Sequence, residues 1–259
     1  MSIRELIDPI PAAGGACTLT GLQHWQQGRA LYGGASALIA YTAAIRAFPD
    51  LPPLRATQIA FVSPTDADIE LRREIVRRGR NVAQVRSEIW NAKGCVLSAY
   101  FLFGEAREAN GRHTAPPADA LASAPEEADE VMSGKGPAFI QANFELRRAQ
   151  ELRGKGKPVV RRWARLTDRE GLDPISELVL LGDVMPPGAM RAMERPGPIS
   201  SINWSFNLLG TEPTTTDGWW LSENASTHAD NGYSSERLRL WNADGRQVMD
   251  GLQSVAIFG

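Results

Sequence analysis

The chain has 259 residues, of which 43% are hydrophobic and 22% charged, a composition typical of a soluble globular protein with one large domain or two smaller ones. Its formal net charge of −2 excludes the basic excess that drives non-specific nucleic-acid binding, and two cysteines are too few for a disulfide framework. The N-terminus lacks a signal-peptide pattern and the apolar runs are too short to span a bilayer, so we expect a cytoplasmic protein with no membrane partner.

The first predicted element is an apolar helix over residues 31–48, which begins around Gly33 and Gly34 and ends before Pro49. A helix that is apolar on every side has to be buried, and this one is too short to be buried in lipid. Short strands joined by turns rich in Gly, Pro and Asn follow it and predict an antiparallel sheet. These strands are expected over residues 56–62, 69–76, 82–89 and 95–103.

Residues 105–140 are rich in Ala, Pro and Glu and poor in large apolar side chains, so we expect a linker that runs over the surface. The linker divides the chain into an N-terminal unit, residues 1–104, and a C-terminal unit, residues 141–259. The second unit has its own predicted apolar helix, over residues 175–185. Its strands are expected over residues 144–147, 159–166, 201–208, 219–225, 235–241 and 248–258.

The two units share a sequence motif, because residues 90–94 (WNAKG) return as residues 241–245 (WNADG). Each copy lies between two segments with alternating polar and apolar residues, which is the pattern of a β-hairpin. The same order of helix, strands and hairpin in both halves indicates an internal repeat. One helix covered by a curved antiparallel sheet is the hotdog fold. We therefore predict an α+β double hotdog with two antiparallel sheets, each wrapped around a central apolar helix.

On these motifs the chain resembles the acyl-CoA thioesterase II family of double-hotdog proteins. Residues 31–34 (LYGG) are similar to the aromatic-Gly-Gly helix start of the family, and residues 76–82 (VRRGRNV) to its arginine hairpin. In the second half, residues 180–183 (LLGD) are similar to the helix end that carries the catalytic aspartate. Residues 200–205 (SSINWS) are similar to the Thr-x-Asp-His-Ser strand, and residues 252–253 (LQ) to the closing Val-Gln pair.

The resemblance implies hydrolysis of fatty acyl thioesters, as part of fatty acid metabolism, by a water molecule that Asp183, Ser201 and Gln253 hold and activate without a covalent intermediate. Ser201 replaces the usual threonine and keeps the hydroxyl group. Asn203 and Trp204 replace the usual aspartate and histidine, a departure that bears on the chemistry or specificity of that wall. Trp204 itself is expected to line the acyl tunnel or to fill the core of the second unit.

The residue types support these roles, but each also has a purely structural interpretation. Asp183 lies in an apolar stretch, where desolvation raises a carboxylate pKa towards the range of a general base, or else it caps a helix end. Gly33 and Gly34 offer backbone N–H groups at a helix start to a thioester carbonyl, or else they allow close helix packing. Arg77 and Arg80 would bind coenzyme A phosphates, or else they form a solvated turn.

Other mechanisms find little support in the sequence. It has no Gly-x-Ser-x-Gly elbow, no Ser-His-Asp arrangement and no His-x-x-x-His site, so we expect neither a metal nor a cofactor. Two alternatives stay open: a non-catalytic acyl-thioester-binding protein, and an enoyl-thioester hydratase, which would need an Asp/His pair. The expected partner is acyl-CoA or another acyl thioester. A second copy of the chain is a further candidate, through exposed strand edges.

Overall fold

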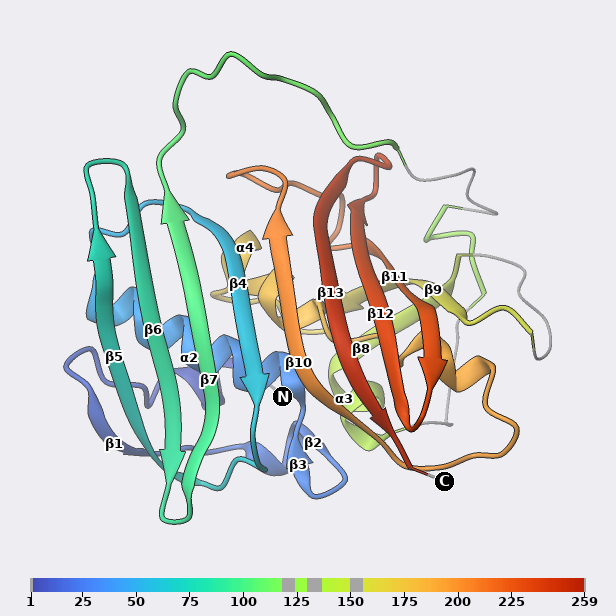
Figure 1. Ribbon diagram of the computed structural model, residues 1–259, viewed down its shortest axis with the longest axis horizontal. Helices are drawn as coiled ribbons and strands as arrows, with labels where there is room; N and C mark the ends of the chain where they lie inside the picture. The colour runs from blue at the N-terminus through green and yellow to red at the C-terminus, as the bar shows by residue number, and fades with distance from the viewer. Residues whose placement is uncertain (1, 118–123, 130–136, 150–155, 259) are drawn as a thin grey trace.

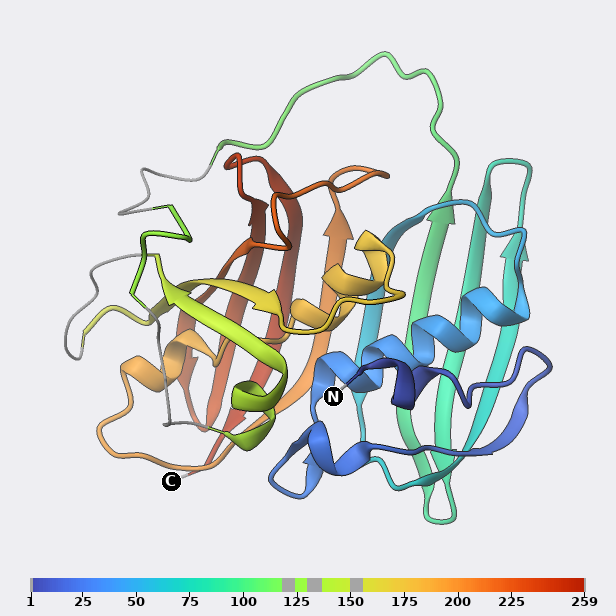
Figure 2. The same cartoon turned by 180° about the vertical axis from the view of Figure 1, so that it is seen from behind.

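The computed structural model describes residues 2–117, 124–129, 137–149 and 156–258. Its largest element is an antiparallel sheet of 11 strands that curves around helices on one face (Figures 1 and 2). The strands lie side by side in the order β1 (Gly15–Thr18), β5 (Asp68–Arg78), β6 (Val82–Asn91), β7 (Gly94–Gly104), β4 (Leu54–Phe61), β10 (Ile199–Leu208), β13 (Gln247–Ile257), β12 (Tyr233–Asn242), β11 (Trp220–Asp230), β9 (Val159–Leu166) and β8 (Phe144–Arg148).

The remaining elements are short, apart from one long helix. They are α1 (Arg4–Ile7), η1 (Leu22–His24), β2 (Gln26–Gln27), β3 (Ala30–Leu31), α2 (Gly33–Ala47), α3 (Ala138–Asn143), α4 (Pro174–Leu181) and η2 (Gly188–Arg191). None of the helices in the described ranges is long and apolar enough to cross a bilayer.

Helix α2 is the predicted apolar helix of the first half, and it lies across β5, β6 and β7. All of its alanines except Ala47 are fully buried, because their small side chains let the helix approach the sheet closely. The Ser87 hydroxyl on β6 donates a hydrogen bond of 2.8 Å to the carbonyl of Ala40, which joins helix and sheet at their centre. Alternating burial along β6 shows that one face of the sheet covers this helix.

Helix α4, in the second half, is shorter than the predicted 175–185. Asp173 caps its first turn by accepting from the amides of Ile175 and Ser176. The helix ends at Leu181, before Gly182, where the indole of Trp204 fills the space that a Cβ would need. The chain then continues into the short 3₁₀ turn η2.

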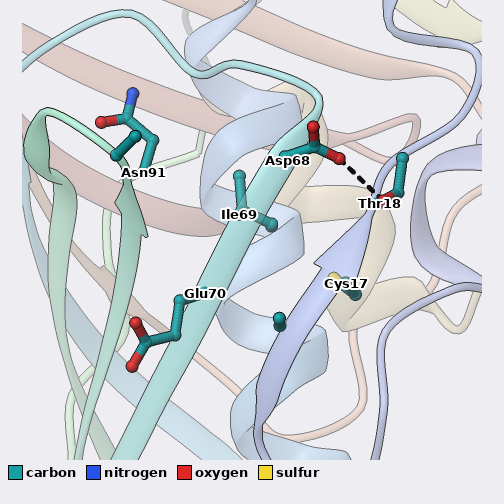
Figure 3. Close-up of a pocket in the computed structure, with 8 residues that line it drawn as sticks. Cys17, Thr18, Asp68, Ile69, Glu70 and Asn91 are labelled. Carbon is teal, nitrogen blue, oxygen red and sulfur yellow. Dashed lines mark hydrogen bonds between the residues drawn. The ribbon is translucent and has the colours of Figure 1, made fainter.

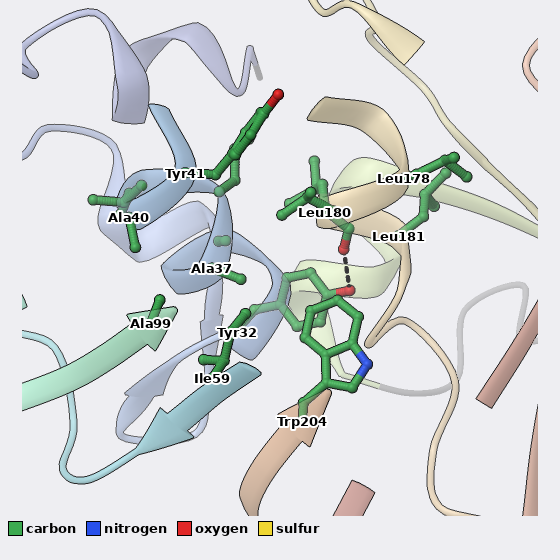
Figure 4. Close-up of a cluster of buried hydrophobic side chains, with 14 of the residues drawn as sticks. Tyr32, Ala37, Ala40, Tyr41, Ile59, Ala99, Leu178, Leu180, Leu181 and Trp204 are labelled. Atoms are coloured by element: carbon green, nitrogen blue, oxygen red, sulfur yellow. Dashed lines mark hydrogen bonds between the residues drawn. The ribbon is translucent and has the colours of Figure 1, made fainter. Parts of the chain in front are cut away.

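The prediction of two separate sheets was wrong, because the strands of the two halves form one continuous sheet. β4 of the first half pairs with β10 of the second, with Trp204 opposite Ile59. Behind this junction α2 packs against α4, and the buried Tyr32 hydroxyl donates to the Leu180 carbonyl at 2.6 Å (Figure 4). Edge-to-edge pairing satisfies backbone groups that two separate sheets would leave exposed.

The opposite face of the second half carries a small apolar cluster of its own, made of Ala149, Trp163, Trp219, Leu221 and Trp241. The guanidinium groups of Arg147 and Arg165 stack over Trp219 at 5.0 and 4.5 Å. Arg147 also donates to the carbonyls of Pro125 and Glu126, so this part of the linker is fixed to the outer face of the sheet.

Candidate active site

Three side chains from distant stretches of the second half meet beside the junction with α2. The Gln253 side-chain amide donates to Asp183 Oδ1 at 2.8 Å and to Ser201 Oγ at 2.7 Å. Gln253 comes from β13, Ser201 from β10 and Asp183 from the segment after α4. One buried amide thus fixes the positions of a carboxylate and a hydroxyl group relative to each other.

A β-bulge in β10 makes this arrangement possible. Ser201 lies opposite Val255 in β13, but Asn203 lies opposite Ser254, so the register shifts by one residue between them. In a regular strand Ser201 and Trp204 would face opposite sides of the sheet, because side chains alternate. The extra residue, Ile202, changes the parity, so that both face the helices. The hydroxyl group reaches the site while the indole stays in the core.

Asp183 has an unusual protonation equilibrium. Burial raises the pKa of its carboxyl group to about 7, and the hydrogen bond from Gln253 opposes that rise. Its Oδ2 lies against Gly33, the first residue of α2, so closely that a Cβ on Gly33 would overlap it. The positive end of the α2 dipole therefore faces this carboxylate.

The carboxylate opens onto a cavity of about 630 Å³. Gly33, Asp183 and Ser201 lie on its wall, whereas Gln253 is buried behind them. Much of the remaining lining is apolar, including Leu31, Phe61, Val96, Phe139, Ile140, Leu146, Val184 and Met185. A largely apolar cavity with a few polar groups at one place suits a ligand with a long hydrocarbon part.

Comparisons with known proteins identify the family. Sequence models of an acyl-CoA thioesterase N-terminal domain and of an acyl-CoA thioesterase C-terminal domain match residues 22–104 and 116–257. The chain belongs to the acyl-CoA thioesterase family. This result confirms the family that the sequence motifs predicted. No curated protein matches this family member by sequence.

Solved structures show that this family member has the hotdog fold. A conserved protein with a hot dog fold from Alicyclobacillus acidocaldarius superposes with a TM-score of 0.84 at 18% identity, over 100% of this chain and 98% of that one. Acyl-CoA thioesterase II TesB2 from Mycobacterium marinum gives a TM-score of 0.75 at 17% identity, over 99% and 98%. The tesB protein of Mycobacterium avium subs paratuberculosis gives 0.75 at 17%, over 95% and 94%.

Two other residues that the sequence suggested for the site, Gly34 and Trp204, do not line the cavity. Gly34 faces α4, where a Cβ would overlap the Leu180 carbonyl oxygen, so this glycine allows the two helices to pack closely. Its neighbour Gly33 is the glycine that lines the cavity. Trp204 is fully buried against Gly182 in the core and is not part of the cavity wall.

The two arginines predicted to bind coenzyme A also lie outside the cavity lining. Arg77 is near the end of β5, and Arg80 is in the turn to β6. Both are exposed. The turn between β5 and β6 is at the end of the sheet opposite to residues 63–65, which precede β5 and do line the cavity (Figure 1). In this position the arginines do not face the cavity that Asp183 lines.

One charged residue of the cavity wall was missed from the sequence, namely Arg162 on β9. Side chains alternate between the two faces of a strand, so Arg162 lies on the same side of β9 as Val160 and Ala164, which belong to the main core. The sequence did contain a signal for Arg162, because it is a charged residue spaced two positions from apolar core residues along a predicted strand.

A second hollow lies on the outside of the first half, between β1 and β5 (Figure 3). Thr18 donates to Asp68 there at 2.7 Å, and Cys17 is half-buried beside them. Burial raises the pKa of the Cys17 thiol, which disfavours the nucleophilic thiolate form. No group of side chains suited to hold a metal ion occurs among the described residues.

Proposed function

We propose that the protein hydrolyses fatty acyl thioesters, such as those of coenzyme A, with a water molecule activated by Asp183. The observation that carries this proposal is the Asp183 carboxyl group on the wall of a largely apolar cavity, with a pKa of about 7. At neutral pH roughly half of such carboxyl groups are ionised, so the group can both accept and return a proton. Membership of the acyl-CoA thioesterase family supports the substrate class.

The reaction balances without a covalent intermediate on the protein. Ionised Asp183 accepts a proton from water while the water oxygen attacks the thioester carbonyl carbon. The carbon–sulfur bond then breaks, and the leaving thiolate receives the proton from Asp183. The products are a carboxylic acid and a thiol. Because the Ser201 oxygen accepts from Gln253, its own hydroxyl hydrogen is available to orient the water, and Gln253 acts as a positioning residue behind both.

The start of α2 would stabilise the negative charge that develops on the carbonyl oxygen. The first backbone hydrogen bond of this helix runs from the amide of Ser36 to the carbonyl of Tyr32. The amides of Gly33 and Gly34 precede that bond and are among the donors that a helix start leaves without intrahelical partners. Gly33 lies on the cavity wall, so we assign its N–H group to the oxyanion.

Two observations favour hydrolysis over the two alternatives. The departures from the family pattern lie off the cavity wall: Trp204 is in the core, and the Asn203 side chain accepts from the amide of Ser254. These two substitutions therefore leave the polar groups of the cavity wall in place. A protein that only binds thioesters would be expected to have lost one of those groups. Among the described residues of the cavity lining there is no histidine to complete the Asp/His pair of a hydratase.

The test is thiol release from a panel of acyl-CoA esters of different chain length. We expect Asp183→Asn to lower kcat by about 100-fold or more, since a general base contributes roughly that factor. Asp68→Asn is the matched control, because its carboxylate lies in the outer hollow and bonds to Thr18. Full activity in Asp183→Asn, or no thiol release by the wild type from any ester, would contradict the proposal. Hydration of an enoyl-CoA would favour the hydratase instead.

A further inference from the structure

Arg162 is unusual because it is a charged residue on the core side of a strand. Along β9 it shares a face with Val160, Ala164 and Leu166, which are all buried in the main core. Among the described residues that line the cavity, Asp183 and Arg162 are the charged ones. Arg162 is half-buried on the cavity wall, and a charged side chain in that position is a candidate for ligand recognition.

Two more arginines lie beside it. Arg148 on β8 is directly opposite Arg162 in the strand pairing, and η2, which ends at Arg191, packs against β9. Burial first, and then the charges of Arg191 and Arg148, lower the pKa of the Arg162 guanidinium. Like charges directly opposite each other in a sheet are destabilising. We call Arg148, Arg162 and Arg191 the arginine cluster; Arg162 is its member on the cavity wall.

Arg162 and the proposed reaction centre lie on different parts of the cavity wall. β9 is the fourth strand beyond β10, which carries Ser201, and neighbouring strands are about 4.8 Å apart. The path along the sheet from Arg162 to Ser201 is therefore roughly 19 Å, and the direct distance across the curve of the sheet is shorter. The pKa shift of Asp183 is due to burial and to Gln253, without a contribution from Arg162, which agrees with this separation. A thioester bound with its carbonyl at Asp183 would place a remote part at Arg162.

We propose that the arginine cluster binds an anionic group of the thioester substrate, remote from the bond that is cleaved. This inference rests on the proposed function, since it names a further feature of the same substrate. Guanidinium groups bind phosphates and carboxylates through charge-assisted, often bidentate hydrogen bonds. The charge would come either from the phosphates of a coenzyme A-type carrier or from a carboxylate at the far end of the acyl chain.

Binding experiments separate the two sources and are independent of hydrolysis. Affinities are measured by calorimetry in an Asp183→Asn background, with and without Arg162→Met. Coenzyme A is compared with pantetheine, which lacks the phosphates, and dodecanedioyl-pantetheine with dodecanoyl-pantetheine, which lacks the terminal carboxylate. We expect Arg162→Met to weaken one of the two charged ligands by about 10-fold or more and to leave its uncharged counterpart unchanged. Turnover in this background would count against Asp183 as the base, without affecting the binding result.

Controls keep a structural role of Arg162 distinguishable from recognition. Arg80→Met removes an exposed arginine outside the cavity and should leave all four affinities unchanged. Arg148→Met, also at an exposed position, should weaken the same charged ligand, and Arg162→Lys should restore part of the loss. An equal loss for charged and uncharged ligands, or no loss at all, would overturn the proposal. If Arg162→Met does not fold, unchanged affinities in Arg148→Met and Arg162→Lys would overturn it.

Discussion

Replacing Gln253 by leucine tests the central geometry of the site. The change removes the amide that donates to Asp183 and Ser201, and the leucine that replaces it fills a similar volume. Because that hydrogen bond favours the ionised carboxylate, its loss raises the pKa of Asp183 above about 7. A hydrogen bond to a charged group is worth about 1.5–3 kcal/mol, and one pKa unit corresponds to about 1.4 kcal/mol. The expected rise is therefore about one to two units.

This rise has a distinct kinetic signature. At pH 7 the ionised fraction of Asp183 falls from about one half to between a tenth and a hundredth, so kcat/KM should fall about 5- to 50-fold. At pH 9 the loss due to protonation should be about 2-fold or less. The assay is thiol release from one acyl-CoA ester between pH 5 and 9.5, corrected for spontaneous hydrolysis. The acid limb of the profile should move to higher pH.

Gln247→Leu is the matched control for this experiment. Gln247 is a second buried glutamine on β13, and its amide donates to the backbone carbonyl of Met249 instead of to the site. Its variant should leave the acid limb in place. The reasoning is refuted if Gln253→Leu shows an unchanged acid limb, or the same loss of activity at every pH, since either result would show that the amide does not control the ionisation of Asp183.

Three further variants test neighbouring parts of the structure. Between about pH 4 and 7 the folded wild type retains a proton on Asp183 that the unfolded chain has released, so its free energy of unfolding falls as pH rises. Asp183→Asn removes this slope, and denaturant titrations should show it gaining up to about 4 kcal/mol over the wild type by pH 7. Gly33→Ala places a Cβ where Asp183 Oδ2 lies and should lower kcat about 100-fold while circular dichroism shows a folded protein. Gly182→Ala forces a Cβ into the indole of Trp204, and urea unfolding should show a loss of about 1–3 kcal/mol.

Much of the fold could be predicted from the sequence because its signals are local. The apolar run over residues 31–48 lies within one residue or two of α2, and the WNAKG and WNADG turns do connect paired strands. The single sheet could not be foreseen, because the pairing of β4 with β10 depends on how two separate units meet. The length of α4 was overestimated for the same reason, since Trp204, distant in sequence, fills the space beside Gly182.

The candidate site shows the same division between local and long-range information. Asp183, Ser201 and Gln253 were selected through a family resemblance, and the structure brings them within hydrogen-bonding distance. Apolarity around Asp183 was a local signal for its raised pKa. The β-bulge at Ile202 left no sequence signal that distinguishes the orientation of Ser201 from that of Trp204. Arg162 had a signal, a charge in phase with core residues, but only the structure shows the cavity that it faces.

The arrangement of the site explains why both halves are needed in one chain. The carboxylate of Asp183 comes from the second half, whereas the helix start against it, at Gly33, comes from the first. A side chain at Gly33 would displace the carboxylate, so the two halves have to differ at this point. Fusion into one chain allows that asymmetry, because each copy can change alone. The pairing of β4 with β10 and the bond from Tyr32 to Leu180 then hold the two contributions in register, so the junction of the halves is itself part of the proposed catalytic apparatus.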